Sequence, residues 1–138
     1  MQNLSYLIIK ASRQLKNKLD KALMEFDITA AQFSVIIQIY SSKQPITAAE
    51  IAERLGSDRP TISGIINRLT KKEIVLKVSN PQDKRSSYLE IYKKSNELVE
   101  NIISISDKLT ADIFSIYSKE EGKELTKMIK KLIKGTEE

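Results

Sequence analysis

Side chains that bond to nucleic-acid bases and phosphates recur along residues 59–72. Arginine, asparagine and hydroxyl groups are spaced so that they fall on one side of a helix, and they are Arg59, Thr61, Ser63, Asn67 and Arg68. Such groups form hydrogen bonds with base edges and with phosphate oxygens. Between them, isoleucines and a leucine recur at helical spacing and predict the buried side of the same helix. At its end, Lys71 and Lys72 are expected to hold phosphates.

A second cationic segment follows at once. Residues 74–78 and 86–92 are rich in β-branched and aromatic residues and flank a charged loop at residues 80–85. Two such runs around a turn-forming loop predict a β-hairpin. The hairpin would carry Lys84 and Arg85 near its tip, beside the polar helix.

The elements that must position these groups have clear boundary signals. Thr47 and Glu50 have the spacing of a capping box, which predicts the start of a short helix. Gly56 follows that helix at the position where a left-handed residue ends it. Asp58 is a favourable N-cap for the next helix, and Pro60 lies in its first turn. The order helix, turn, helix, hairpin predicts a winged helix-turn-helix, which places its second helix in the major groove.

Helices are expected on both sides of this motif. Apolar residues at helical spacing predict one long helix over residues 4–26 and another over 93–117. Thr29–Gln32 has the form of a capping box opening a helix through residue 40, and a last helix starts at Ser118. The predicted fold is mainly α with a small β-hairpin wing, and it forms one chain over residues 1–138.

The long helices also predict a dimer. A helix of 25 residues spans ~37 Å, more than a small domain needs to cover itself. An intramolecular helical core is the alternative for each helix alone. With terminal helices at both ends, we expect residues 1–42 and 93–138 to form a homodimer and residues 43–92 to form the DNA-binding lobe. The two-fold symmetry would match a palindromic operator.

Composition agrees with a polyanionic partner. The chain has 23 basic and 18 acidic residues, and residues 43–94 alone contain 11 basic and 6 acidic ones. The positive excess therefore coincides with the motif, whereas a generic basic surface would not explain that coincidence.

Several residue types are absent. The chain has no cysteine and no histidine, which removes disulfides, thiolate metal sites and the usual general base. No metal or cofactor is expected. No apolar run reaches the ~18 residues that span a membrane. The N-terminus lacks the pattern of a secretory signal, so we expect a cytoplasmic protein without membrane contact.

Taken together, the motifs resemble the multiple-antibiotic-resistance regulator (MarR) family. The resemblance covers nearly the whole chain and lies in Ile51–Gly56, Thr61–Ser63, Ile66–Leu69, Asp83–Arg85 and the upstream Ile28–Phe33. It implies a homodimeric winged-helix transcription regulator, usually a repressor, released from DNA by small aromatic or anionic effectors.

The resemblance also implies roles for single residues. Arg59 to Lys72 would be the recognition helix, Arg85 the minor-groove residue, and Asp83 the acid that orients the wing. An ordinary ion pair between Asp83 and Arg85 is the alternative, and it would contribute little. Glu73 departs from the family, which often has glycine there, and this puts the turn geometry in doubt. Lys84 keeps the charge of the family's arginine without its bidentate fork.

An effector pocket is the least specific expectation. By position in the family, its lining residues would be Tyr6, Arg13, Phe33, Ile37 and Tyr40. Arg13 could pair with a carboxylate, although an arginine there is often simply solvated. Aromatic residues at helical spacing are likewise often part of the core.

Three classes of function are compatible with these patterns. A sequence-specific DNA-binding regulator explains the motif, the charge and the terminal helices together. A winged-helix protein-interaction module explains the fold but not the polar set on one surface. An enzyme is the least favoured because the chain lacks histidine, cysteine and a glycine-rich phosphate loop. Steep salt dependence of DNA affinity would separate the first class from the second.

Overall fold

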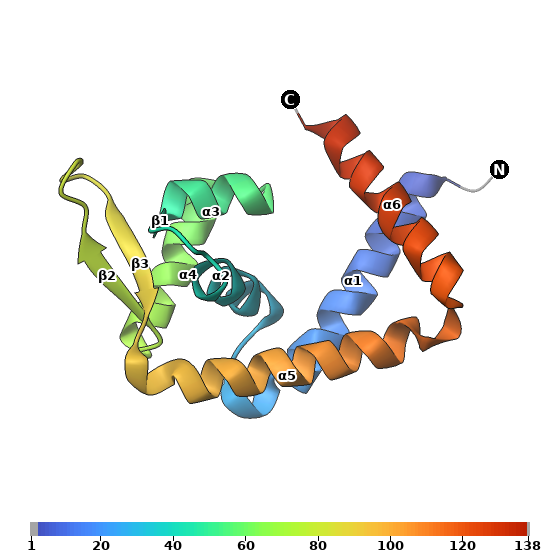
Figure 1. Cartoon of the computed structure of the whole chain (residues 1–138), viewed down its shortest axis with the longest axis horizontal. Coiled ribbons are helices and arrows are strands. Elements are labelled where there is room, and N and C mark those ends of the chain that lie inside the picture. Colours follow the sequence, from blue (N-terminus) through green and yellow to red (C-terminus); the bar gives the residue numbers. More distant parts are fainter. Residues whose placement is uncertain (1–2, 138) are drawn as a thin grey trace. The chain divides into compact units, whose positions relative to one another are not determined.

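The computed structural model describes residues 3–137, and these divide into two compact units at residues 106 and 107. The first unit holds the helix-turn-helix and the sheet (Figure 1). The helices are α1 (Leu4–Ala22), α2 (Ala30–Tyr40), α3 (Ala48–Leu55), α4 (Arg59–Lys71), α5 (Asn96–Ile113) and α6 (Lys119–Thr136). The strands are β1 (Ile46–Thr47), β2 (Val75–Ser79) and β3 (Ser87–Ile91). The predicted fold class, mainly α with a small β wing, is confirmed.

Two of the long predicted helices end earlier than expected. Helix α1 ends at Ala22, and the chain continues as a short 3-10 turn over Met24–Phe26. A second such turn, Lys93–Ser95, precedes α5, and a third, Phe114–Ile116, follows it. At the end of the first turn, Asp27 adopts a left-handed conformation with φ of 57°, which reverses the chain before α2.

Capping side chains start several helices. At Thr29–Gln32, both halves of the predicted capping box are formed. A complete capping box is also formed at Ser118–Glu121, where the sequence had predicted only a helix start. The box predicted at the start of α3 is only half formed. The Thr47 hydroxyl accepts from the Glu50 amide at 3.3 Å, but the Glu50 carboxylate bonds to that hydroxyl at 3.1 Å instead of to the Thr47 amide. Thr47 is thus an N-cap without the reciprocal bond.

The turn after α4 is well formed although it lacks glycine. Glu73 adopts φ of 59°, and its amide donates to the Thr70 carbonyl at 3.0 Å. The Ile74 amide donates to the Leu69 carbonyl at 3.0 Å, and both of these side chains are buried. This pair of bonds with its apolar contact is a Schellman motif. The turn that the sequence left in doubt is therefore closed by a glutamate in a glycine-type conformation.

The sheet has one strand more than predicted. Its order is β1-β3-β2, and both pairings are antiparallel. Leu89 of β3 lies opposite Ile46 of β1 and opposite Lys77 of β2. The hairpin of β2 and β3, with its loop, is called the wing below, and its tip projects away from the helices of its own unit (Figure 1).

One hydrophobic core holds the first unit together. The recognition helix contributes Ile62, Ile65, Ile66 and Leu69 to it, as expected. Helix α2 contributes Phe33, Val35, Ile36 and Ile39, and α5 contributes Val99 and Ile102. Because α2 and the start of α5 pack in this core, residues outside 43–92 help to hold α4 and the wing in place.

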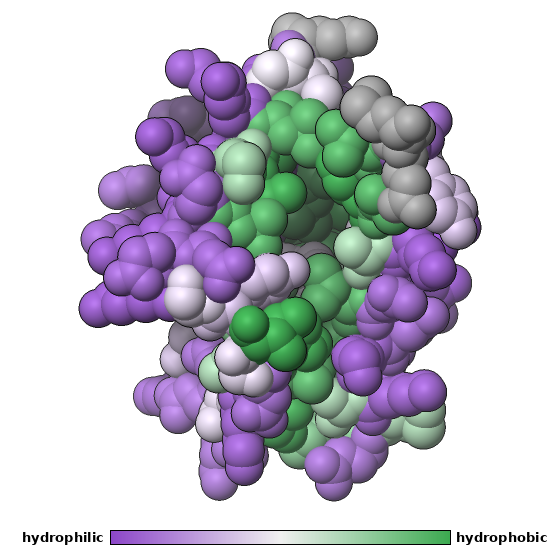
Figure 2. Space-filling view, turned by 90° about the vertical axis from the view of Figure 1, so that its right-hand side faces the viewer, coloured by the Kyte–Doolittle hydropathy of each residue, from purple (hydrophilic) through white to green (hydrophobic). Residues whose placement is uncertain are grey.

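Much apolar surface stays open elsewhere. Residues 4–18 of α1 are all exposed, including leucines and isoleucines at helical spacing. In the second unit, α6 has no buried residue and exposes Met128, Ile129, Leu132 and Ile133. Figure 2 displays exposed hydrophobic side chains bordered by hydrophilic ones. Within residues 3–137, no helix is both long and apolar enough to cross a membrane.

Candidate nucleic-acid interface

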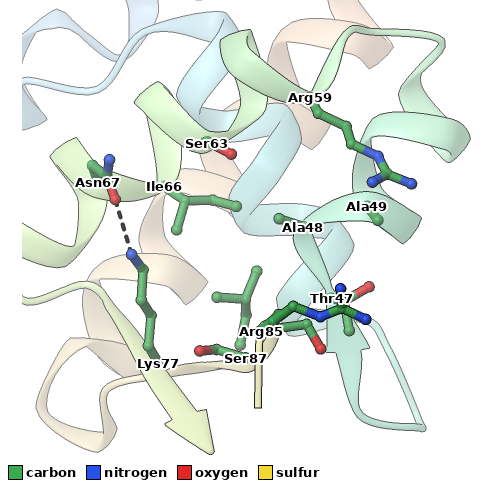
Figure 3. Close-up of a pocket in the computed structure, with 12 residues that line it drawn as sticks. Thr47, Ala48, Ala49, Arg59, Ser63, Ile66, Asn67, Lys77, Arg85 and Ser87 are labelled. Carbon is green, nitrogen blue, oxygen red and sulfur yellow. Dashed lines mark hydrogen bonds between the residues drawn. The ribbon is translucent and has the colours of Figure 1, made fainter. Parts of the chain in front are cut away.

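A cleft of about 310 Å³ lies between the recognition helix and the wing (Figure 3). We call it the α4–wing cleft. Cationic and hydroxyl side chains dominate its wall, and none of the lining residues is acidic. They are Thr47, Ala48, Ala49, Arg59, Ser63, Ile66, Asn67, Lys77, Arg85, Ser86, Ser87 and Leu89. A pocket whose wall carries cations and no acidic residue favours an anionic or acceptor-rich partner.

Helix α4 delivers one row of side chains to this cleft. Arg59, Ser63 and Asn67 are four residues apart and therefore lie above one another on one face. All three are exposed, whereas Ile62, between them in sequence, is buried in the core. The burial of the opposite face thus fixes the direction in which this polar row points.

Strand β2 contributes Lys77 to the cleft, in addition to the arginines from α4 and the wing loop. Because side chains alternate along a strand, Lys77 shares a face with the buried Val75 and not with Leu76. Its ammonium donates a hydrogen bond to Asn67 Oδ1 at 2.9 Å, which Figure 3 shows as a dashed line. The sequence had not singled out Lys77. The only available signal was its position two residues after a core valine in the first wing strand.

The loop of the wing is held by its own polar groups. The Arg85 amide donates to Asp83 Oδ1 at 2.9 Å, and the Arg85 guanidinium lies 3.6 Å from the same oxygen. Asn80 accepts from the Gln82 amide at 3.0 Å and donates to the Ser86 hydroxyl at 3.0 Å. The loop is therefore ordered by Asp83 and Asn80, and Asn80 had not been expected to contribute. Lys84 lies exposed between the aspartate and the arginine.

The ion pair between Asp83 and Arg85 leaves the arginine accessible. The Arg85 side chain is 95% exposed and that of Asp83 is 48% exposed. An exposed pair of this kind contributes little to stability. The backbone bond to Asp83 orients the residue, while the guanidinium remains available to a partner.

The remaining predicted contacts separate into two groups. Thr61, Arg68 and Lys71 are exposed on α4 but do not line the α4–wing cleft. Lys72 is directed to a different neighbour, because its ammonium bonds to the Asp27 carbonyl and lies 3.3 Å from the Asp27 carboxylate. It also lies 3.5 Å from Gln32 Oε1. Lys72 thus ties the end of α4 to the turn before α2.

The start of the recognition helix is fixed by Asp58. Its carboxylate accepts from the Thr61 amide at 2.8 Å. This backbone hydrogen bond, together with one from the Thr61 side chain, lowers the pKa of Asp58 below its usual 3.8. Asp58 is charged at neutral pH and lies at the positive end of the helix dipole, which further favours the capped helix.

The five residues expected around an effector are dispersed. Phe33 lies in the core, and Ile37 packs against that core. Tyr6 and Arg13 are exposed on α1. The Tyr40 hydroxyl lies 3.4 Å from Glu100 Oε1, and Tyr40 lines a separate groove beside the far face of the wing. Within one chain, these side chains do not share one of the described cavities.

The fold and the α4–wing cleft define a winged helix-turn-helix transcriptional regulator of the DNA-binding class. Residues 28–87 match the model of the MarR family. The crystal structure of the Staphylococcus aureus MepR–DNA complex is similar with a TM-score of 0.89 and 28% identity, covering 98% of this chain and 99% of that one. Wild-type MarR of E. coli in its apo form gives 0.77 and 26% identity over 96% and 97% of the two chains.

A curated relative agrees with the solved structures. The uncharacterized HTH-type transcriptional regulator YdcH of Bacillus subtilis is 27% identical over 120 residues, which are 85% of this chain and 82% of the relative. Residues 28–87 thus form a MarR-family domain, and nearly the whole chain is similar in fold to MarR of E. coli. The family and these relatives are transcriptional regulators rather than enzymes.

Proposed function

We propose that the protein is a cytoplasmic, homodimeric repressor that binds a pseudo-palindromic operator in double-stranded DNA. The α4–wing cleft carries this proposal, because Arg59, Lys77 and Arg85 all line it and no acidic residue does. In the proposed complex α4 enters the major groove, and Arg85 at the wing reaches the adjacent minor groove. The similarity to MepR, which has been crystallised on DNA, supports the same docking.

The proposed contacts divide by chemistry. Thr61, Ser63 and Asn67 would recognise base edges, and Arg59 would contribute to the same surface. Lysines and arginines with long exposed side chains would hold phosphates, and they are Arg68, Lys71 and Lys84. Lys72 would contact DNA only after leaving Asp27, so we assign it a structural role first.

Unpartnered helices support the homodimer. An isolated helix is marginal in water unless an apolar face is covered. Residues 4–18 of α1 are exposed throughout, and α6 buries none of its own residues. A second copy of the chain would cover these faces, and residues 43–92 would remain free to reach the two half-sites.

Regulation by a small aromatic or anionic effector completes the proposal. The five residues named for the pocket are dispersed over one chain, from Tyr6 on α1 to Tyr40 at the end of α2. An effector site that includes them would have to be completed by the partner copy. Binding there would change the distance between the two recognition helices and thereby release the operator.

Footprinting on the DNA that flanks the protein's own gene tests the proposal directly. We expect protection of a pseudo-palindrome, with affinity that falls steeply as salt rises from 50 to 200 mM. Transcription from that DNA should decrease when the protein is added. If no DNA site is protected, and the protein instead binds another protein with an affinity that does not change with salt, the chain is a winged-helix interaction module.

A further inference from the structure

The hydrogen bond between Lys77 and Asn67 restricts what the recognition helix presents to DNA. An ammonium group has donors and no acceptor, so the amide of Asn67 turns its oxygen toward Lys77. The amide nitrogen then lies on the side of the group away from Lys77 (Figure 3). One lone pair of the oxygen is occupied by the lysine.

A free asparagine has a different recognition preference. It pairs with adenine through two bonds, because its oxygen accepts from the adenine amino group while its nitrogen donates to N7. That arrangement needs the amide oxygen directed at the base. In this chain the oxygen is directed at Lys77, so the amide can offer a base mainly its nitrogen donors.

The lysine adds further donors at the same place. Only one of its three N–H groups is used on Asn67, which leaves two for a base. Guanine presents two acceptors, O6 and N7, in the major groove, whereas adenine presents one acceptor and one donor. An array in which donors outnumber acceptors therefore fits guanine better than adenine, whose amino group needs an acceptor.

We propose that Asn67 and Lys77 act as one recognition unit that selects guanine at one position in each half-site. This rests on the proposed operator binding and specifies the base that the cleft prefers. Lys77 is a specificity-determining residue in the wing, although its role depends on a residue of the recognition helix.

Packing holds the unit together before DNA arrives. Lys77 pairs with Leu89 across the hairpin, and Leu89 is buried. Asn67 follows Ile66 on α4, and Ile66 is also buried. Since both backbone positions are anchored in the same core, the two side chains are held within reach of each other, and the bond between them is present before DNA binds.

The test is selection of bound DNA from an operator pool with randomised half-sites. The parent is compared with Lys77→Met, with Asn67→Ala and with a control, Lys93→Met. The control removes an exposed lysine that lies outside the wing but in the same compact unit of the fold, residues 1–106. The position contacted by Asn67 is the one whose base preference disappears in Asn67→Ala. Lys77→Arg, which keeps the donors, serves as the rescue variant.

We expect the parent and Lys93→Met to prefer guanine over adenine at that position by about tenfold or more. Lys77→Met should lose this preference and favour adenine, and Lys77→Arg should keep guanine. Because Lys77 is exposed, a merely structural or electrostatic role would lower affinity for all sequences alike and leave the base preference unchanged.

The outcomes separate this inference from the broader proposal. A parent protein that selects no DNA sequence overturns the proposed function and this inference together. A parent that selects an operator but prefers adenine at the Asn67 position overturns only the inference. The same conclusion holds if Lys77→Met retains the guanine preference of the parent.

Discussion

Arg85 combines an ordered backbone with an accessible charge. Its amide is bonded to Asp83, while its side chain is 95% exposed, which leaves the guanidinium available to the narrow minor groove. We predict that Arg85→Ala weakens operator binding and reduces the log–log slope of affinity against salt by about one unit. Fluorescence anisotropy over a salt series measures both quantities.

The matched control for this prediction is Lys93→Ala, which removes an exposed cation outside the wing. It should change the slope less than Arg85→Ala. Thermal unfolding and oligomeric state should be the same in both variants, because neither side chain is buried. An Arg85→Ala protein with the affinity and slope of the parent would show that the wing does not contact DNA.

Asp58 makes the folding of the recognition helix depend on pH. Hydrogen bonds from Thr61 lower its pKa in the folded state, so its contribution to stability is present above the unfolded value near 3.8. That contribution is lost as pH falls through the lower folded pKa. We predict that Asp58→Asn is less stable than the parent at pH 7, and that the difference narrows toward pH 3.

Urea unfolding at several pH values measures this difference. Asp107→Asn, in the middle of α5, is the control. The difference in unfolding free energy between this variant and the parent should not narrow as the pH falls. A stability difference between Asp58→Asn and the parent that stays constant across the pH range would contradict the charge-dependent cap.

At the scale of elements, the turn from α4 into the wing sets the direction of β2. A left-handed conformation costs an L-residue roughly 1–2 kcal/mol, and Glu73 adopts it with φ of 59°. The Glu73 carboxylate also pairs with Lys94. We predict that Glu73→Gly is more stable than Glu73→Gln by about 0.5–1 kcal/mol, because glycine relieves the strain while both variants lose the ion pair.

Chemical denaturation of the two variants beside the parent gives the comparison. Equal stability of the glycine and glutamine variants would mean that the turn is not strained. Operator affinity should be nearly the same for both, since Glu73 does not line the α4–wing cleft.

The elements show which features a sequence can reveal. Caps such as Asp58 and turns such as Gly56 depend on a few neighbouring residues, so their spacing predicted them correctly. Strand β1 escaped prediction because it has two residues and is formed only by pairing with β3, about forty residues later. Its pairing depends on tertiary packing, which local patterns do not contain.

The candidate site shows the same limit. The polar row of α4 follows from helical spacing, and its exposure was predictable from the buried isoleucines opposite. The bond from Lys77 to Asn67 depends on the register of the hairpin against α4, which no local pattern determines. The attachment of Lys72 to Asp27 likewise depends on where the turn before α2 lies.

At the scale of the whole chain, charge and apolar surface are segregated by sequence. Residues 43–94 contain 11 basic and 6 acidic residues, whereas residues from 95 onward contain 7 basic and 9 acidic ones. The cationic part includes the α4–wing cleft, and α1 and α6, outside that part, expose apolar side chains. This segregation is expected of a protein that binds DNA with one region and a second copy of itself with another.

We therefore predict a homodimer that binds one pseudo-palindrome with half-site centres ~10 base pairs, or one helical turn, apart. Light scattering at micromolar concentration should give twice the mass of 15.7 kDa, and the operator should bind one dimer. Replacing Leu132 and Ile133 of α6 by serine should weaken the dimer, because both side chains are exposed on its apolar face. Replacing the polar neighbours Lys130 and Lys131 should not. A monomer that still binds the operator one-to-one with full affinity would contradict the symmetric complex and leave a single recognition helix to provide the specificity.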